Sequence, residues 1–152
     1  MKYIIVISIS FLIISCQEKK SIEFPKKEVE VITMNQITSN YDTLIKRVKK
    51  EGNVEAYDEL FYGFMDSNES ERTDSLMIYS KIMAKNFNFE KAYFDYFKAL
   101  CEKYKIEVDY SNYSTIDISP LDKRPKEEAL NWLKNMKEKK IITTEQYNLI
   151  KK

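Results

Sequence analysis

Apolar side chains recur at spacings of three and four residues through most of the chain from Asn40 onward. This period places them on one face of an α-helix, so each stripe predicts one amphipathic helix. The five stripes are Tyr41, Leu44, Ile45 and Val48; Tyr57, Leu60, Phe61, Phe64 and Met65; Leu76, Tyr79, Ile82, Met83 and Phe87; Phe89, Ala92, Tyr93, Tyr96, Phe97, Leu100, Cys101 and Tyr104; and Leu130, Trp132, Leu133 and Met136. The pattern therefore predicts an all-α domain over residues 39–152.

Residues that favour helix ends separate these stripes. Gly52 suits the left-handed residue that ends a helix, and Asn53 suits the cap that starts the next one. Asn88 is expected to cap the fourth helix in the same way. Pro125 favours the start of the fifth helix, after an irregular insertion over residues 105–124.

Two pairs have the spacing of a capping box, in which side chain and backbone bond reciprocally at a helix start. Asn68 with Glu71 predicts the start of the third helix, and Thr143 with Gln146 predicts a short sixth helix. Asp66 and Asn68 also have the spacing that opens a calcium loop. Glu71 occupies the position where such a loop needs glycine, so capping is the better interpretation.

The first sixteen residues have a different pattern. A short basic start is followed by an apolar run from Tyr3 to Ile14, interrupted only by Ser8 and Ser10. This run is too short to span a bilayer stably, but its length is typical of the core of a secretory signal.

The run Ile13-Ile14-Ser15-Cys16 resembles the lipobox of bacterial lipoproteins. The resemblance implies that residues 1–15 are a signal peptide and that Cys16 becomes a diacylated N-terminus. Two acyl chains are what stable membrane anchoring requires. A transmembrane anchor, or an ordinary signal peptide with an incidental cysteine, stays open as the alternative.

The residues after the cysteine bear on location within the cell envelope. Gln17 stands where an aspartate often retains lipoproteins at the inner membrane, which favours the outer membrane. The cluster Glu18-Lys19-Lys20 loosely resembles the export signal of surface lipoproteins of Bacteroidota, and both the periplasmic face and the cell surface stay open. Residues 16–38 mix charge with one proline and lack helical periodicity, which predicts a flexible tether. Alternation of β-branched residues over 29–33 leaves a short extended piece open.

The pair Ala56-Tyr57 recurs as Ala92-Tyr93, 36 residues later, a period typical of stacked helical hairpins. The run from Gly52 to Leu60 resembles the turn of Sel1-like repeats, which are relatives of the tetratricopeptide repeat. Ala129 and Trp132 resemble the start of the helix that precedes such a turn. The resemblance implies about three stacked antiparallel hairpins and a scaffold or protein-binding role. The final hairpin departs from it, because Lys139-Lys140 replace the turn glycine.

The amino-acid composition limits the kinds of catalytic, metal and ligand site that we expect in this chain. The sequence has no histidine, which removes the commonest general base and metal ligand. The formal net charge is +1, and Lys2 is the only charged side chain before Cys16. A near-neutral chain has no global field that would attract nucleic acid. We therefore expect no nucleic-acid partner, no cofactor, no metal and no small-molecule substrate.

The remaining reactive side chains have ordinary interpretations. Cys101 lies in an apolar stripe, where a thiol packs rather than reacts. Four carboxylates, those of Glu107, Asp109, Asp117 and Asp122, fall in the irregular segment. They are expected to be solvated loop charges, although two of them could form the pair that a hydrolase uses.

Three tyrosines, Tyr62, Tyr110 and Tyr113, lie off the strongest stripes. They could anchor a partner, because a phenol offers rigid contact area and a hydrogen bond, or they could complete the core of a small domain. The sequence as a whole favours a non-catalytic, lipid-anchored protein that binds another protein. An immunity lipoprotein that neutralises a toxin is a special case of this function, and a carboxylate hydrolase is the less favoured alternative.

Overall fold

The computed structural model describes residues 40–65 and 69–152. The predicted signal peptide, the lipobox at Cys16, the tether, and the Asp66 and Asn68 positions lie outside the described residues. The chain divides into two units, residues 1–31 and 32–152, and all described residues belong to the second.

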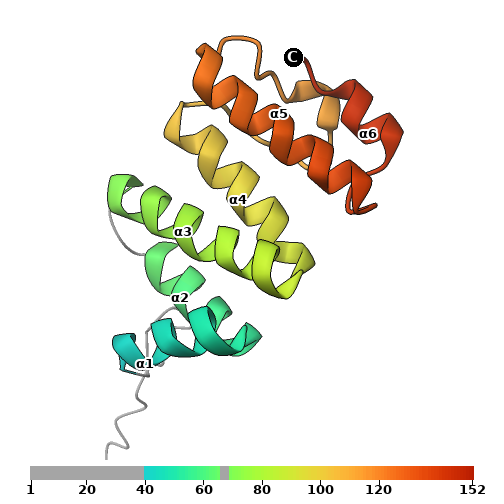
Figure 1. The fold of residues 1–152 in the computed structure, drawn as a ribbon. Coiled ribbons are helices and arrows are strands. Elements are labelled where there is room, and N and C mark those ends of the chain that lie inside the picture. The colour runs from blue at the N-terminus through green and yellow to red at the C-terminus, as the bar shows by residue number, and fades with distance from the viewer. Residues whose placement is uncertain (1–39, 66–68) are drawn as a thin grey trace, which may run out of the picture. The chain divides into compact units, whose positions relative to one another are not determined.

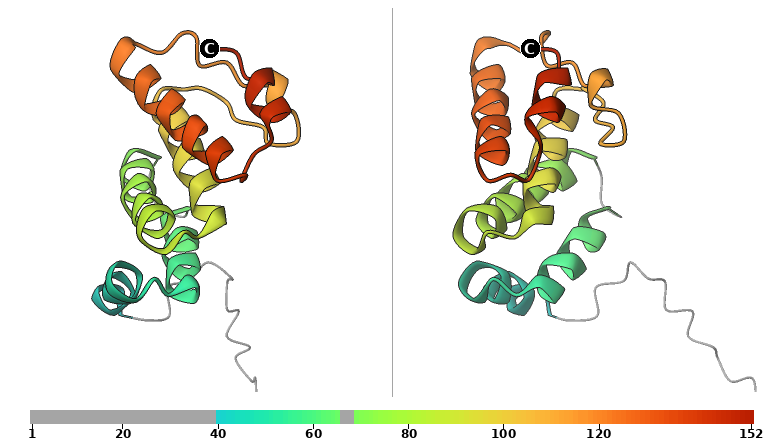
Figure 2. Two further views of the ribbon diagram at one scale, coloured as in Figure 1. Left: turned by 45° about the vertical axis from the view of Figure 1, so that its right-hand side comes forward. Right: turned by 90° about the vertical axis from the view of Figure 1, so that its right-hand side faces the viewer.

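The described ranges hold helices and no β-strand, as the periodicity predicts (Figure 1). In chain order the elements are α1 (Tyr41–Lys46), the π-helical η1 (Arg47–Glu51), α2 (Val54–Met65), α3 (Glu69–Phe87), α4 (Glu90–Lys103), the 3-10 turn η2 (Tyr113–Thr115), α5 (Lys123–Glu138) and α6 (Thr144–Leu149). Each α-helix packs against the next one along the chain (Figure 2). No helix within these ranges is long and apolar enough to cross a bilayer.

The turns before α2 and before α4 have the same design. Gly52 (φ 62°) and Asn88 (φ 54°) both adopt the left-handed conformation that ends a helix. The N–H of the following residue then bonds back to a carbonyl six residues earlier, from Asn53 to Arg47 (3.3 Å) and from Phe89 to Met83 (3.1 Å). The Asn53 side chain accepts the N–H of Ala56 at 2.8 Å, so the predicted end and start at Gly52 and Asn53 are confirmed.

The prediction that Asn88 caps the fourth helix is wrong. The residue before α4 is Phe89, which has an extended backbone and no side-chain cap bond. Asparagine tolerates the left-handed region, so Asn88 ends α3 instead. Its side-chain oxygen accepts the Lys139 ammonium at 2.8 Å, which ties this turn to the end of α5.

Helix α4 lies at the centre of the core, between α3 and α5 (Figure 1). Its predicted stripe is buried from Ala92 to Cys101, whereas Tyr104 at its C-terminal end is exposed. Phe87, at the C-terminal end of the α3 stripe, is exposed as well. The stripe of α5 is likewise buried at Trp132, Leu133 and Met136. The periodicity therefore predicts the core-facing side of both helices.

Helix α2 is fixed to its neighbours by a buried polar contact as well as by apolar packing. The Tyr57 hydroxyl donates to Asp95 of α4 at 2.8 Å and lies 2.9 Å from the Ser80 hydroxyl of α3. Since the phenol has only one proton, Ser80 is the donor to Tyr57. The Lys91 ammonium pairs with Asp95 at 3.0 Å and with Asp58 at 3.3 Å. Three helices thus share one network of hydrogen bonds and ion pairs.

The segment between α4 and α5 is irregular, as predicted, but it belongs to the core. Ile116 and Ile118 are fully buried. The backbone of Lys151 pairs with both of them, since its N–H donates to Ile116 (3.0 Å) and its carbonyl accepts from Ile118 (2.9 Å). Helix α5 begins at Lys123, two residues before the predicted start at Pro125.

The last helix confirms the predicted capping box. The Thr143 hydroxyl accepts the N–H of Gln146 at 3.1 Å, and the Gln146 side chain accepts the N–H of Thr143 at 2.7 Å. Both orphan donors at the start of α6 are thereby satisfied.

Candidate functional site

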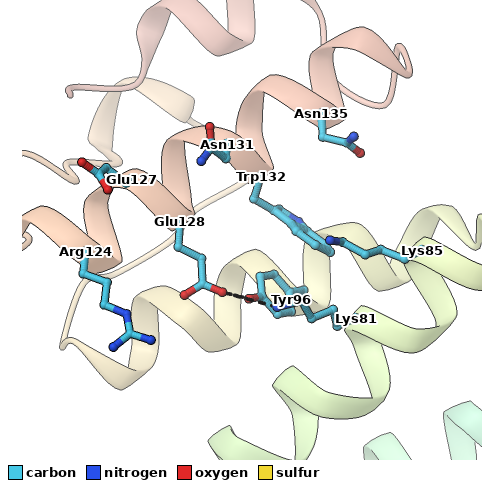
Figure 3. A pocket seen from close by; sticks show the side chains of 9 residues that line it. All are labelled: Lys81, Lys85, Tyr96, Arg124, Glu127, Glu128, Asn131, Trp132 and Asn135. Carbon is cyan, nitrogen blue, oxygen red and sulfur yellow. Dashed lines mark hydrogen bonds and ion pairs between the residues drawn. The ribbon is translucent and has the colours of Figure 1, made fainter.

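A cavity of about 590 Å³ opens between α3 and α5, with α4 as its floor (Figure 3). Helix α3 contributes Lys81 and Lys85, and α4 contributes Tyr96. Helix α5 contributes Arg124, Glu127, Glu128, Asn131, Trp132 and Asn135. A second cavity of about 320 Å³ shares Lys81, Tyr96 and Glu128 with the first, so the two adjoin at these side chains. We call their combined surface the α3–α5 groove.

Helical spacing brings these polar side chains to one face. Arg124, Glu128, Asn131 and Asn135 follow one another at intervals of four, three and four residues, which aligns them along one side of α5. Lys81 and Lys85 are four residues apart and align in the same way along α3. The apolar stripe of each helix is turned toward the core, so these polar faces are left to line the groove.

The floor of the groove is aromatic and held in place. The rings of Tyr96 and Trp132 lie 3.9 Å apart between centroids. The Trp132 indole N–H donates to the backbone carbonyl of Tyr93 at 2.9 Å. Both side chains are buried, with 1% of Tyr96 and 6% of Trp132 exposed. The floor is therefore preorganised and does not need to rearrange around a ligand.

Glu128 is already committed to partners on the groove floor and wall. Its carboxylate accepts a hydrogen bond from the Tyr96 hydroxyl and pairs with the Lys81 ammonium at 3.5 Å. Burial, together with the hydrogen bond to Glu128, raises the pKa of Tyr96, so the phenol stays protonated and continues to donate. Lys81 also lies 5.4 Å from the centre of the Tyr96 ring.

Other groups on the walls have unused hydrogen-bonding capacity. Within the described part of the chain, Arg124, Asn131 and Asn135 make no hydrogen bond or ion pair. Lys85 faces the Trp132 ring at 5.9 Å but has no carboxylate partner among the described residues. A guanidinium, an ammonium and two amides are thus available to a ligand.

The second cavity is more apolar. Met77 and Ile78 of α3 line it, and 53% of the Ile78 side chain is exposed. Its rim carries the ion pair between Lys103 and Asp74, at 2.8 Å, and the hydrogen bond to Asp74 raises the pKa of Lys103. This end of the groove offers an apolar contact with charge at its edge.

None of the three predicted tyrosines lines the groove. Tyr113 is buried, and Tyr110 donates its hydroxyl to the backbone carbonyl of Phe94 at 2.6 Å. Burial is the main reason why the pKa of Tyr110 is raised. Tyr113 therefore belongs to the core, and the partly buried Tyr110 packs against it. Tyr62 on α2 is 46% exposed and stays a candidate contact residue, but it lies apart from the other two.

Asp109 and Asp117 form hydrogen bonds within their own turns, and Cys101 packs in the core. Asp109 accepts the N–H and hydroxyl of Ser111, and Asp117 accepts the N–H of Ser119; these bonds lower the pKa of each carboxyl. Each carboxylate is used within its own turn. Cys101 is fully buried, and burial raises the pKa of its thiol to about 12. Among the described residues, no three His, Cys, Asp or Glu side chains are grouped so that they could hold a metal.

The sequence alone missed the groove residues. Periodicity identifies Asn131 and Asn135 as the polar side of the fifth helix. It does not show that this side faces Lys81 and Lys85 of the third helix.

Comparison of the chain with models of known protein families, with curated proteins and with solved structures gives no match. The function of the groove is therefore argued from its own geometry.

Proposed function

We propose that this chain is a lipid-anchored protein of the cell envelope, non-catalytic, whose helical domain binds another protein in the α3–α5 groove. The anchor is Cys16, for which the support is the lipobox-like run of residues 13–16. The observation that carries the binding role is the groove itself, in which a buried aromatic floor adjoins polar groups without partners among the described residues.

The dimensions of the groove suit an extended chain. From Arg124 to Asn135 the α5 wall is about 16 Å long, at about 1.5 Å per helical residue. An extended peptide of about five residues covers that length. Two adjoining cavities of different polarity also fit a run of successive side chains better than one compact small molecule. A peptide segment of a partner protein is therefore the ligand class we favour.

We further propose that the helices are arranged as repeats of the Sel1-like or tetratricopeptide type. The support is the equivalence of two turns 36 residues apart, Gly52 before α2 and Asn88 before α4. In each case the left-handed residue is followed by one residue whose N–H bonds back to a carbonyl six residues earlier, and the helix begins after it. The Ala-Tyr pairs at 56–57 and 92–93 are then buried alike. In such an arrangement α3 and α5 occupy successive positions along a binding face.

Site-specific photo-crosslinking in intact cells tests the binding site. A photoreactive phenylalanine analogue is placed at Asn131 in the groove or, as the matched control, at the exposed amide position Asn148 on α6. We expect a discrete crosslinked protein from the Asn131 position and none from Asn148. Equal crosslinking from both positions, or none from either, would contradict the proposal.

Metabolic labelling with radioactive palmitate tests the anchor. Wild type and the Cys101→Ala variant should incorporate label, whereas Cys16→Ala should not, because these are the two cysteines of the sequence. Protease treatment of whole cells then shows whether the domain is on the surface. Label retained by Cys16→Ala would refute lipidation at this residue without bearing on the groove.

A further inference from the structure

We infer that the peptide bound in the α3–α5 groove is acidic: an extended segment that presents one side-chain carboxylate to Arg124 and another to Lys85, which lie toward opposite ends of the first cavity (Figure 3). This inference rests on the proposed function and specifies the chemistry of its ligand. Charge, amide spacing and the apolar end of the groove are the three observations that carry it.

The charge available to a ligand in the groove is positive. Of the three carboxylates on its walls, Glu128 is paired with Lys81 and held by Tyr96, and Asp74 is paired with Lys103. Glu127, three residues from Arg124, also lines the cavity, but Figure 3 shows its carboxylate pointing away from the floor and from the Arg124 guanidinium. Arg124 and Lys85 are left without a carboxylate partner in the described part of the chain. A guanidinium binds a carboxylate through two parallel hydrogen bonds, which makes an acidic side chain the complementary ligand.

The two amides match the repeat of an extended backbone. Asn131 and Asn135 are four helical residues apart, a rise of about 6 Å along α5. Alternate residues of an extended chain are separated by about 6.6 Å. Each amide offers both a donor and an acceptor, so the pair can bond to two backbone positions of the same orientation. These contacts would hold the backbone of an extended peptide whatever its sequence. The charges of Arg124 and Lys85 would then favour peptides with acidic side chains.

The adjoining cavity adds an apolar contact. The exposed Ile78 side chain, with Met77 beside it, would be covered by a large apolar residue of the ligand. Covering this surface is favourable because it removes apolar area from water. The ligand that satisfies both cavities is therefore a short extended segment with acidic and apolar residues together.

Selection from a random-peptide phage library tests this inference on the full-length protein in detergent micelles. Selected peptides are synthesised with their Asp and Glu residues intact or replaced by Asn and Gln. Binding is followed by the fluorescence of Trp132, the one tryptophan of the sequence, which lies in the groove. The variant Arg124→Gln removes the unpaired guanidinium. Lys134→Gln on the same helix removes an exposed cation that lines neither cavity.

We expect the selected peptides to be enriched in acidic residues and to bind more weakly as salt is raised. Amide replacement or Arg124→Gln should weaken binding about tenfold or more, the size expected for a charge-assisted hydrogen bond, whereas Lys134→Gln should leave it unchanged. Groove-binding peptides that are neutral or basic would overturn this inference and leave the proposed function standing. Failure to select any peptide that perturbs Trp132 would overturn both.

Discussion

The turn between η1 and α2 leaves no room for a side chain at Gly52. Its backbone is left-handed (φ 62°), and a Cβ added there would lie 2.2 Å from Cδ1 of the Phe87 ring. The Gly52→Ala substitution therefore meets two separate penalties, one from the backbone conformation and one from a ring that must move.

The two penalties can be estimated separately. An L-residue in the left-handed conformation costs about 1–2 kcal/mol relative to glycine. Displacing a packed ring by one added methyl costs roughly another 1–3 kcal/mol. Gly52→Ala should therefore lower the free energy of unfolding by about 2–5 kcal/mol, a large part of the 5–15 kcal/mol typical of a domain.

A double-mutant cycle with Phe87→Ala separates these terms. Once the ring is removed, alanine at Gly52 should cost only the backbone term, about 1–2 kcal/mol. The coupling energy between the two positions should then be about 1–3 kcal/mol. Urea unfolding followed by far-ultraviolet circular dichroism and by tryptophan fluorescence measures all four proteins of the cycle.

Lys140→Gly is a control for which the change in the free energy of unfolding should have the opposite sign. Lys140 is exposed and also has a left-handed backbone (φ 60°), so Lys140→Gly should be neutral or slightly stabilising. If Gly52→Ala cost the same with and without the Phe87 ring, the steric part of the reasoning would be refuted. If it cost less than about 0.5 kcal/mol, the conformational part would fail as well.

Two further predictions concern buried ionisable groups. On a Cys16→Ala background, iodoacetamide should modify Cys101 only as fast as the protein unfolds, because the thiol is buried and its pKa is raised to about 12; mass spectrometry measures the rate, and modification at the rate of a free thiol would refute burial. The pKa values of Tyr57 and Tyr96 are raised above 10.0 mainly by burial, so the unfolded chain releases protons that the folded state retains. The free energy of unfolding should be unaffected by these phenols below about pH 10 and should fall above it, by about 1.4 kcal/mol per pH unit for each phenol. Ionisation of all 11 tyrosines while helix content stays constant would contradict this.

The features predicted correctly from the sequence are local ones. The Thr143 capping box involves only residues three apart, and the end of the first helical segment depends on the conformational freedom of Gly52 itself. The apolar stripe of α4 reveals its buried face because helical geometry alone decides which residues share a side. Nothing distant in the chain is needed for these predictions.

The features that the sequence did not decide involve a choice between two local roles or a contact between distant segments. Asparagine favours both helix caps and left-handed helix ends, and only the path from α3 to α4 shows that Asn88 takes the second role. Tyr110 and Tyr113 lie in a segment without periodicity, so the sequence does not show whether their side chains face the core or the solvent. Their burial depends on the packing of that segment over α4.

The groove depends on long-range packing for the same reason. The backbones of α3 and α5 are not in contact, and each is positioned by its own packing against α4. Only side chains connect the two walls: Lys81 reaches Glu128 and Lys85 faces Trp132. The width of the groove is thus set by how α5 sits on α4. The segment before α5 is anchored by the buried Ile116 and Ile118, whose backbones pair with Lys151. A segment that looks like an insertion in the sequence is, in physical terms, part of the core.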